Sequence, residues 1–253
     1  SVDGTSYKPD TVQKVHQSYG RDFQLPNLTA YNETCANIGN VLWNWRMFLL
    51  TGEAKYIDVL ELSLYNSVLS GVGLEGRDYF YTNPLASSSH FPYHMRWEGG
   101  RQAYISKSNC CPPNTVRTIA EVQHYQYSMR ANELFVNMYS GNTLKTTLDN
   151  GQSILLEQQT DYPWAGRVNI KLLEYPSGMN LHLRIPDWCK QFSILINGIK
   201  LKPQASESGY VTLNQKWEKN DLIVLDLSMP VTMIDTHPLV RERRNSVMEK
   251  VEA

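Results

Sequence analysis

The chain has 253 residues, and its 24 basic and 25 acidic side chains give a formal net charge of −1 at pH 7. This near balance provides no broad electrostatic attraction to nucleic acid or to an anionic membrane, so neither is expected as a partner. Because no apolar run reaches the roughly 20 residues of a membrane span, we expect a globular protein with one large or two small domains.

Three helices are predicted in the first half of the chain. A helical hydrophobic period covers residues 33–51 and stops at Gly52, and a second covers residues 54–70 and stops at Gly71. Together they predict a helical hairpin. A third helix is predicted from about residue 113 to residue 130, with prolines at its start.

The long stretch 71–109 contains only a short strand-like piece at residues 79–81, and loops of such length are usually functional or disordered. From residue 133 onward the hydrophobic period is that of strands. Alternating runs occupy residues 134–139, 153–158, 167–173, 180–185, 193–196, 199–202, 210–213 and 222–227. The pair Asn197 and Gly198 is typical of a hairpin turn, and the spacing of the runs favours an antiparallel β-sandwich.

The change of period predicts an α+β chain that divides near residue 132. Residues 1–132 form a helical domain, residues 133–238 form the β-sandwich, and residues 239–253 form a charged tail that suits a frayed helix.

Two short motifs contain residues that suit a zinc ion. Glu33 and Cys35 lie in the first motif, and the adjacent Cys110 and Cys111 lie in the second. Thiolates and a carboxylate are zinc ligands, and four of them complete a tetrahedral shell. Adjacent cysteines pair poorly with each other, because the bridge would close a strained ring.

Both motifs lie at predicted helix starts, where free amide groups and the helix dipole favour anions. Residues two apart on a regular helix point about 200° from each other. Glu33 and Cys35 can therefore share an ion only if Glu33 precedes the helix. On spacing alone the competing interpretation, three buried thiols without metal, is equally open.

The other metal-binding residue types are better explained as ordinary residues. Cys189 follows Asp187 and Trp188 at a strand end without a partner cysteine, and we expect a packed thiol there. Solitary histidines at irregular spacing favour plain polar roles over ligation; these are His16, His90, His94 and His124. His182 and His237 fall in the predicted β-sandwich.

Longer motifs resemble a known family of glycosidases. The segment 25–36 reads Leu-Pro-Asn-Leu-Thr-Ala-Tyr-Asn-Glu-Thr-Cys-Ala, residues 79–85 read Tyr-Phe-Tyr-Thr-Asn-Pro-Leu, and residues 110–114 read Cys-Cys-Pro-Pro-Asn. With Gly39 and Asn40, these segments closely resemble glycoside hydrolase family 127 and its relative, family 146. The resemblance covers the chain up to about residue 245.

The resemblance implies a fold and an activity. The family's catalytic domain is an (α/α)6 barrel followed by β-sandwich domains, and similar members remove β-L-arabinofuranose or related plant pectin sugars with retention. It also implies that Glu33, Cys35, Cys110 and Cys111 bind zinc. Cys110 would be the nucleophile that forms a thioglycosyl intermediate, and Tyr81 would lie near it.

One residue departs from the family pattern. The family's general acid/base is a glutamate sixteen residues before the zinc glutamate, and Gln17 stands at that position. An amide cannot donate or accept the proton, a step worth roughly 10²–10⁴-fold in rate. Gln17 is consistent with a substitution that traps substrate, with a weakened or non-hydrolytic relative, or with a leaving group that needs less help. The alternative function is thus a non-catalytic, zinc-stabilised carbohydrate-binding or structural fragment.

About three helices cannot close a barrel of six hairpins, so we expect the C-terminal part of the barrel in this chain. Such a part would expose apolar stripes, which predicts self-association or a partner chain. Cations before the second motif, Arg96, Arg101 and Lys107, raise the alternative of an acidic pectin sugar as substrate. Family habit favours a periplasmic location over a cytoplasmic one.

Overall fold

The structure is a computed structural model that describes residues 22–23, 32–83, 102–103, 110–148 and 150–240. The chain forms two compact units. The first unit comprises Ser1–Trp43, Leu62–Ala120 and Thr232–Ala253, and the second comprises Asn44–Glu61 and Glu121–Val231. The fold mixes helices with antiparallel and mixed sheets, as the α+β prediction requires.

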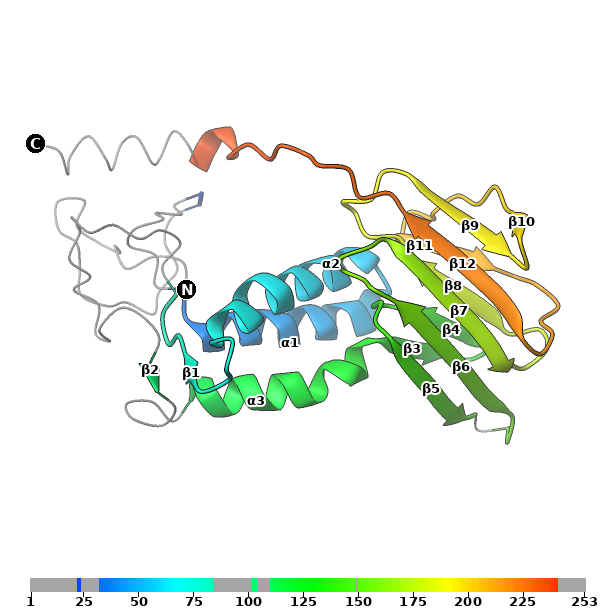
Figure 1. Cartoon of the computed structure of the whole chain (residues 1–253), viewed down its shortest axis with the longest axis horizontal. Helices are drawn as coiled ribbons and strands as arrows, with labels where there is room; N and C mark the ends of the chain where they lie inside the picture. The colour runs from blue at the N-terminus through cyan, green and yellow to red at the C-terminus, as the bar shows by residue number, and fades with distance from the viewer. Residues whose placement is uncertain (1–21, 24–31, 84–101, 104–109, 149, 241–253) are drawn as a thin grey trace, which may run out of the picture. The chain divides into compact units, whose positions relative to one another are not determined.

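Helix α1 (Thr34–Thr51) and helix α2 (Ala54–Ser63) form the predicted hairpin (Figure 1). Gly52 separates them with φ of +71°, a conformation that glycine adopts without strain. Beyond α2 the chain stays helical as a π-helix (η1, Leu64–Val68) and a 3₁₀ turn (η2, Leu69–Gly71). The Ser70 hydroxyl donates to the carbonyls of Asn66 and Ser67, and such bonds compete with regular helix geometry.

The third helix is shorter than its period predicts. Helix α3 (Cys111–Glu121) tightens into the 3₁₀ turn η3 (Val122–Tyr125), and strand β3 (Tyr127–Arg130) follows. The prediction of helix up to residue 130 is therefore wrong over its last four residues. Strand β3 pairs with β4 (Glu133–Val136), and this pairing outweighs the local helical period. The boundary predicted at residue 132 falls inside the β3–β4 hairpin.

Ten strands of the second unit form two sheets (Figure 1). The six-stranded sheet is antiparallel throughout and has the order β10 (Ile199–Lys200), β9 (Phe192–Ile196), β12 (Asp221–Leu227), β7 (Arg167–Glu174), β6 (Ser153–Thr160) and β5 (Asn142–Thr147). The four-stranded sheet has the order β11 (Tyr210–Leu213), β8 (Asn180–Arg184), β4 and β3.

Two features of these sheets differ from the sequence prediction. Strand β5 was not predicted, because its residues are mostly polar and each is at least partly exposed, so it has no apolar alternation. Strands β4 and β8 pair in parallel, so antiparallel pairing is wrong for this pair. Three strands of the other sheet, β5 to β7, intervene between β4 and β8 in the chain, and β8 returns in the same direction as β4.

Alternation of buried side chains explains why the strands form. In β6 and β7 the residues Ile154, Leu156, Ile170 and Leu172 are fully buried, and in β4 and β8 the same holds for Leu134, Val136, Leu181 and Leu183. Each sheet therefore presents one apolar face to a core. The predicted Asn197–Gly198 turn is confirmed, since both residues have positive φ between β9 and β10.

A buried ion cluster joins the helical segment 44–61 to the four-stranded sheet inside the second unit. The Arg184 side chain is fully buried and forms ion pairs with Asp58 and, at 2.8 Å, with Glu61. Its Nε donates to the carbonyl of Asn137, and the Tyr162 hydroxyl donates to Glu61 at 3.1 Å. Burial opposes the charge on Arg184, but Glu61 and Asp58 keep its pKa above the usual value.

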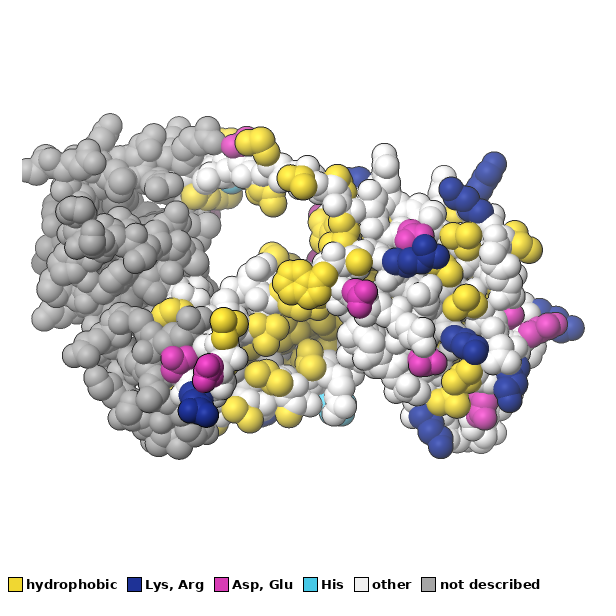
Figure 2. Space-filling model, viewed as in Figure 1, with side chains coloured by type: hydrophobic (Ala, Val, Ile, Leu, Met, Phe, Trp, Pro, Cys, Tyr) yellow, Lys and Arg dark blue, Asp and Glu magenta, His cyan; other side chains and the backbone are white. Residues whose placement is uncertain are grey.

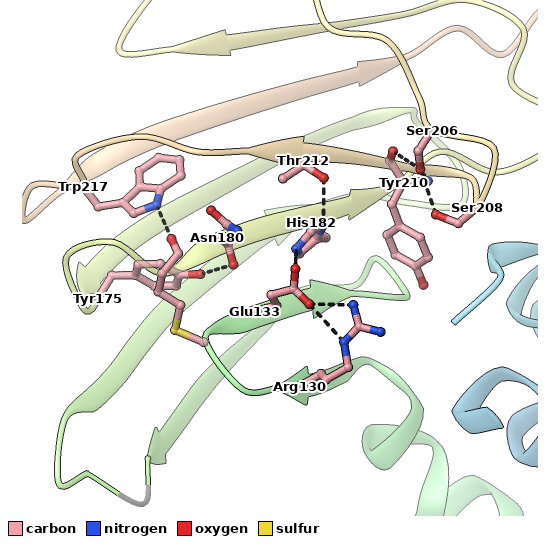
Figure 3. Close-up of polar contacts among 11 residues, drawn as sticks. Arg130, Glu133, Tyr175, Asn180, His182, Ser206, Ser208, Tyr210, Thr212 and Trp217 are labelled. Carbon is pink, nitrogen blue, oxygen red and sulfur yellow. Dashed lines mark hydrogen bonds and ion pairs between the residues drawn. The ribbon is translucent and has the colours of Figure 1, made fainter. Parts of the chain in front are cut away.

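A second polar network lies on the same sheet and crosses its strands (Figure 3). Thr212 on β11 bonds to Nδ1 of His182 on β8 at 3.0 Å, and Nε2 of His182 lies 3.5 Å from Glu133 on β4. Glu133 in turn pairs with Arg130 on β3 at 2.8 Å. The His182 ring stacks on Phe135 with centroids 4.1 Å apart.

Large apolar side chains are exposed on the helices, as Figure 2 shows for one face. In the first unit these include Trp43, Leu62, Val116 and Ile119, of which Trp43 is 66% exposed. Within the described part of the chain, no helix combines the length and the apolar character that crossing a membrane requires. Of the predicted tail, only residues 239–240 are described, and 241–253 lie outside the described residues.

Candidate metal centre

The first motif enters helix α1 from an extended segment. Glu33 forms an isolated antiparallel bridge with Thr82, and the helix begins at Thr34. The Thr34 amide donates to the carbonyl of Tyr81 at 3.0 Å, and its hydroxyl donates to the carbonyl of Phe80 at 2.6 Å. Because Glu33 lies before the first helical turn, its carboxylate can face the same point as the Cys35 thiol.

The second motif forms the start of helix α3. Cys111 is the first helical residue, and the backbone N–H of Asn114 donates to the carbonyl of Cys110 at 3.0 Å, which closes the first turn. Pro112 and Pro113 occupy first-turn positions, where a missing N–H costs no helical hydrogen bond. Both motifs thus lie at helix N-termini, as predicted from the sequence.

The structure brings the two motifs together. One donor atom from each of Glu33, Cys35, Cys110 and Cys111 lies within 4.8 Å of all the others. The Sγ atoms of Cys35 and Cys111 are 3.2 Å apart, those of Cys110 and Cys111 are 3.8 Å apart, and Cys111 Sγ lies 3.9 Å from Glu33 Oε1.

These distances fit a tetrahedral zinc site. Ligand atoms at roughly 2.3 Å from a tetrahedral ion lie about 3.8 Å from one another. The measured separations bracket this value, and three thiols with one carboxyl are a donor set that zinc accepts. The residues present therefore fit the ion that the resemblance implies.

Burial distinguishes the members of the cluster. Cys111 is fully buried, Glu33 is 8% exposed, Cys35 is half-buried, and Cys110 is exposed. Tyr79, Tyr81 and Cys111 form one apolar cluster, against which Cys35 packs. Tyr81 therefore lies beside the cysteine pair, and Cys110 is the thiol that faces outward.

The thiols of Cys35 and Cys111 have pKa values shifted in opposite directions. The hydrogen bond shared with Cys111 lowers the pKa of Cys35 to about 6, and a hydrogen bond from the Asn114 side chain contributes in the same direction. The same hydrogen bond, followed by burial, raises the pKa of Cys111 well above its usual value. Of these two thiols, Cys35 therefore loses its proton first, and a nearby cation would favour the thiolate of Cys111 as well.

The remaining candidates do not join this cluster. Cys189 is buried, its Sγ donates to the carbonyl of Gln191 at 3.1 Å, and burial raises its pKa, so the prediction of a packed thiol is confirmed. His124 is exposed on η3, and His237 stacks on Phe23 with centroids 4.9 Å apart. Several predicted residues lie outside the described ones: His16, Gln17, His90, His94, Arg96, Arg101 and Lys107.

Sequence reasoning assigned no role to Asn114 and Arg117. In the structure the Asn114 Nδ2 donates to Cys35 Sγ at 3.1 Å, and the Arg117 guanidinium donates to Asn114 Oδ1 at 2.9 Å. The signal in the sequence was the spacing of three from Cys111 to Asn114 and again to Arg117, which aligns residues on one helical face.

Two family models match the chain in succession. Residues 2–124 match the β-L-arabinofuranosidase GH127 catalytic domain, and residues 133–229 match the GH127 middle domain. A curated relative, the non-reducing end β-L-arabinofuranosidase of Bifidobacterium longum subsp. longum, is 29% identical over 250 residues, which cover 92% of this chain and 36% of that protein.

Solved structures support the same family as the two family models. A protein described as a glycoside hydrolase is 48% identical with a TM-score of 0.86, and the match covers 96% of this chain and 40% of that one. A GH127 β-L-arabinofuranosidase from Geobacillus stearothermophilus is 38% identical with a TM-score of 0.82, covering 94% of this chain and 38% of the relative.

These matches place the chain among the glycoside hydrolase families. The chain belongs to glycoside hydrolase family 127. It spans about two fifths of the length of the relatives that it matches.

Proposed function

We propose that this chain supplies the zinc-thiolate part of a retaining glycoside hydrolase that acts on β-L-arabinofuranosides or related plant pectin sugars. The observation that carries the proposal is the meeting of Glu33, Cys35, Cys110 and Cys111 within 4.8 Å at two helix N-termini. The names of the family models and of the curated relative supply the sugar class.

The four residues would hold one zinc ion. Zinc at this position would keep the thiols deprotonated at neutral pH and would make a departing thiolate more stable. The two helix N-termini favour the same anionic state of the site.

The acidic-sugar alternative rests on Arg96, Arg101 and Lys107, which lie outside the described residues.

Cys110 is the proposed nucleophile, because it is the exposed thiol of the cluster and a sugar can reach it. Its Sγ forms a bond to the anomeric carbon while the bond from that carbon to the leaving oxygen breaks. The leaving oxygen then needs a proton, and the position where the family has its glutamate holds Gln17. Water must later replace the sulfur at the same carbon, with loss of a proton to a base.

We further propose that helices α1 to α3 belong to an (α/α)6 barrel and that the two large sheets form the β-sandwich predicted from the sequence. The exposed apolar side chains Trp43, Leu62 and Val116 support a covering partner, either a second copy or another chain. Light scattering at micromolar concentration should then give a mass above that of the single chain, and a strict monomer would contradict this part of the proposal.

The decisive experiment looks for the covalent adduct. Because Gln17 cannot assist hydrolysis, an aryl β-L-arabinofuranoside, whose phenolate leaves without much acid help, should load Cys110 and then stall. Intact-mass and peptide analysis should locate one anhydropentose on Cys110, after elemental analysis has shown one zinc per chain.

Matched variants make this test specific. Cys110→Ala should abolish the adduct, whereas Cys189→Ala, which removes a buried thiol elsewhere, should leave it intact. Gln17→Glu should replace stalling by turnover. Zinc binding without an adduct in the parent and without turnover in Gln17→Glu would favour the non-catalytic alternative that the glutamine suggests.

A further inference from the structure

The three thiols of the cluster are not equivalent, and Asn114 contributes to the difference. Its side-chain amide lies 3.1 Å from Cys35 Sγ, in the first turn of α3, and is half-buried. Cys35 also shares a thiol hydrogen bond with Cys111, and that bond is lost when both sulfurs bind a metal as thiolates. The amide proton of Asn114 does not depend on that ionisation.

Arg117 fixes which way the Asn114 amide points. The guanidinium has donors and no acceptor, so the Asn114 atom that receives its hydrogen bond at 2.9 Å must be the oxygen. The NH₂ group is therefore directed at Cys35. One turn of helix α3 thus contains a chain of donors that runs from Arg117 through Asn114 to the sulfur.

The charge of the proposed site explains why such donors are needed. Three thiolates and one carboxylate carry more negative charge than a divalent ion can neutralise. An amide N–H on one sulfur, backed by a guanidinium, offsets part of this excess in a partly buried place. The hydrogen bond also withdraws electron density from Cys35, which makes that sulfur a weaker nucleophile.

We propose that Asn114, oriented by Arg117, is a positioning residue that holds Cys35 as a non-reacting metal ligand and leaves the exposed Cys110 as the reactive thiolate. This inference rests on the proposed metal site. Asn114 acts through Cys35 and need not touch the sugar.

Cobalt in place of zinc provides a readout that a merely structural residue would not change. The energy of the sulfur-to-cobalt charge-transfer band depends on hydrogen bonds to the sulfur. In Asn114→Ala the band should move to longer wavelength, because the lone pairs of Cys35 are no longer stabilised. Affinity for zinc, measured by competition with a chromophoric chelator, should fall by about 10-fold or more.

Two other changes test the same chain of donors. Asn114→Asp keeps the acceptor for Arg117 but places a negative charge against Cys35, so zinc affinity should fall further than in Asn114→Ala. Arg117→Ala removes an exposed side chain, leaves α3 intact and frees the amide. It should shift the band in the same direction by less, and it remains informative if Asn114→Ala fails to fold.

Asn40→Ala is the matched control. Asn40 lies on α1 in the same unit, and its side-chain amide donates to Ser63 Oγ at 3.1 Å. If the parent protein binds no cobalt, the proposed metal site fails. If the parent binds it and the Asn114 variants match Asn40→Ala in spectrum and affinity, the site stands and the role of Asn114 is refuted.

Discussion

Two clusters of ionisable side chains in this protein are built on opposite principles. The Arg184 cluster pairs one buried cation with the carboxylates of Asp58 and Glu61, so the chain itself supplies the counter-charge at its centre. The thiol cluster of Glu33, Cys35, Cys110 and Cys111 contains only groups that are neutral or anionic. Among the described residues, two helix N-termini and the Asn114 side-chain amide lie against it, and the proposed cation would supply further positive charge.

The source of positive charge distinguishes a structural cluster from a candidate binding site. A charge that is fully paired and buried resists change, because breaking the pair leaves an uncompensated ion away from water. A group of acids and thiols that converge without a cation of their own is arranged for a ligand. Burial alone does not distinguish the two, since Arg184 and Cys111 are both fully buried.

The largest effect should follow from removing the cation of the Arg184 cluster. Arg184→Met leaves the buried Glu61 and the partly buried Asp58 without their cation and should lower the free energy of unfolding by about 3–5 kcal/mol. Urea unfolding followed by tryptophan fluorescence measures this loss. The triple variant with Asp58→Asn and Glu61→Gln should recover part of it, because no charge is then left unpaired. A loss below about 1 kcal/mol in the single variant would show that the cluster is not the anchor of segment 44–61.

Removing the metal should instead act locally on the thiol cluster. A ligand at a thousand times its dissociation constant stabilises the folded state by about 4 kcal/mol. In the zinc-loaded protein, chelation should therefore speed amide hydrogen exchange in the first turns of α1 and α3, and it should leave β8, which contains Arg184, unchanged. Exchange that rises equally in β8 would mean that the two clusters do not respond independently.

The sequence predicted the thiol cluster better than the Arg184 cluster, for a physical reason. The residues that could bind a metal are neighbours in the sequence. The pair Cys110 and Cys111 precedes two prolines that mark a helix start, and Glu33 lies two residues before Cys35. The sequence alone therefore indicates both the ligand type and the position at helix starts. Arg184 is the last residue of β8, on the opposite face from Leu181 and Leu183, and in the sequence it looks like an outward-facing polar position. It is fully buried because segment 44–61, far away in sequence, covers that face of the strand.

The close approach of that segment also explains a glycine. A Cβ at Gly209 would lie 2.6 Å from the Cβ of Ala54, and Gly209 has φ of +85°. Strands β3 and β5, which the sequence did not predict, also depend on distant contacts. Tyr127–Arg130 and Asn142–Thr147 are strands because they pair with neighbouring strands, and their own hydrophobic pattern does not indicate a strand.

His182 lies outside both the Arg184 cluster and the thiol cluster, and its mutation should change stability by a smaller, pH-dependent amount. Burial lowers its pKa below the usual 6.5, although Glu133 opposes the shift and Arg130 adds to it. The folded state then binds fewer protons than the unfolded state, so the stability associated with neutral His182 is complete above about pH 6.5 and is lost as the pH falls below it. His182→Gln should cost about 1 kcal/mol at pH 7.5 through the lost contact with Thr212. The difference between parent and variant in urea midpoint should shrink at pH 5.5, and a constant difference would contradict this assignment.

The smallest effect is expected at Arg130, which makes the same type of ion pair as Arg184 in a different setting. Its side chain is 77% exposed and forms its 2.8 Å pair with Glu133 at the surface. Water already solvates the Arg130 charge and reaches part of Glu133, so Arg130→Gln should change the free energy of unfolding by less than about 0.5 kcal/mol, and added salt should reduce the difference. Measured in the same urea series as Arg184→Met, this variant compares an exposed arginine with a buried one, because both arginines lie in the four-stranded sheet and both pair with carboxylates. A loss at Arg130 that approaches the loss at Arg184 would show that position in the sheet, and not burial of the charge, controls the cost.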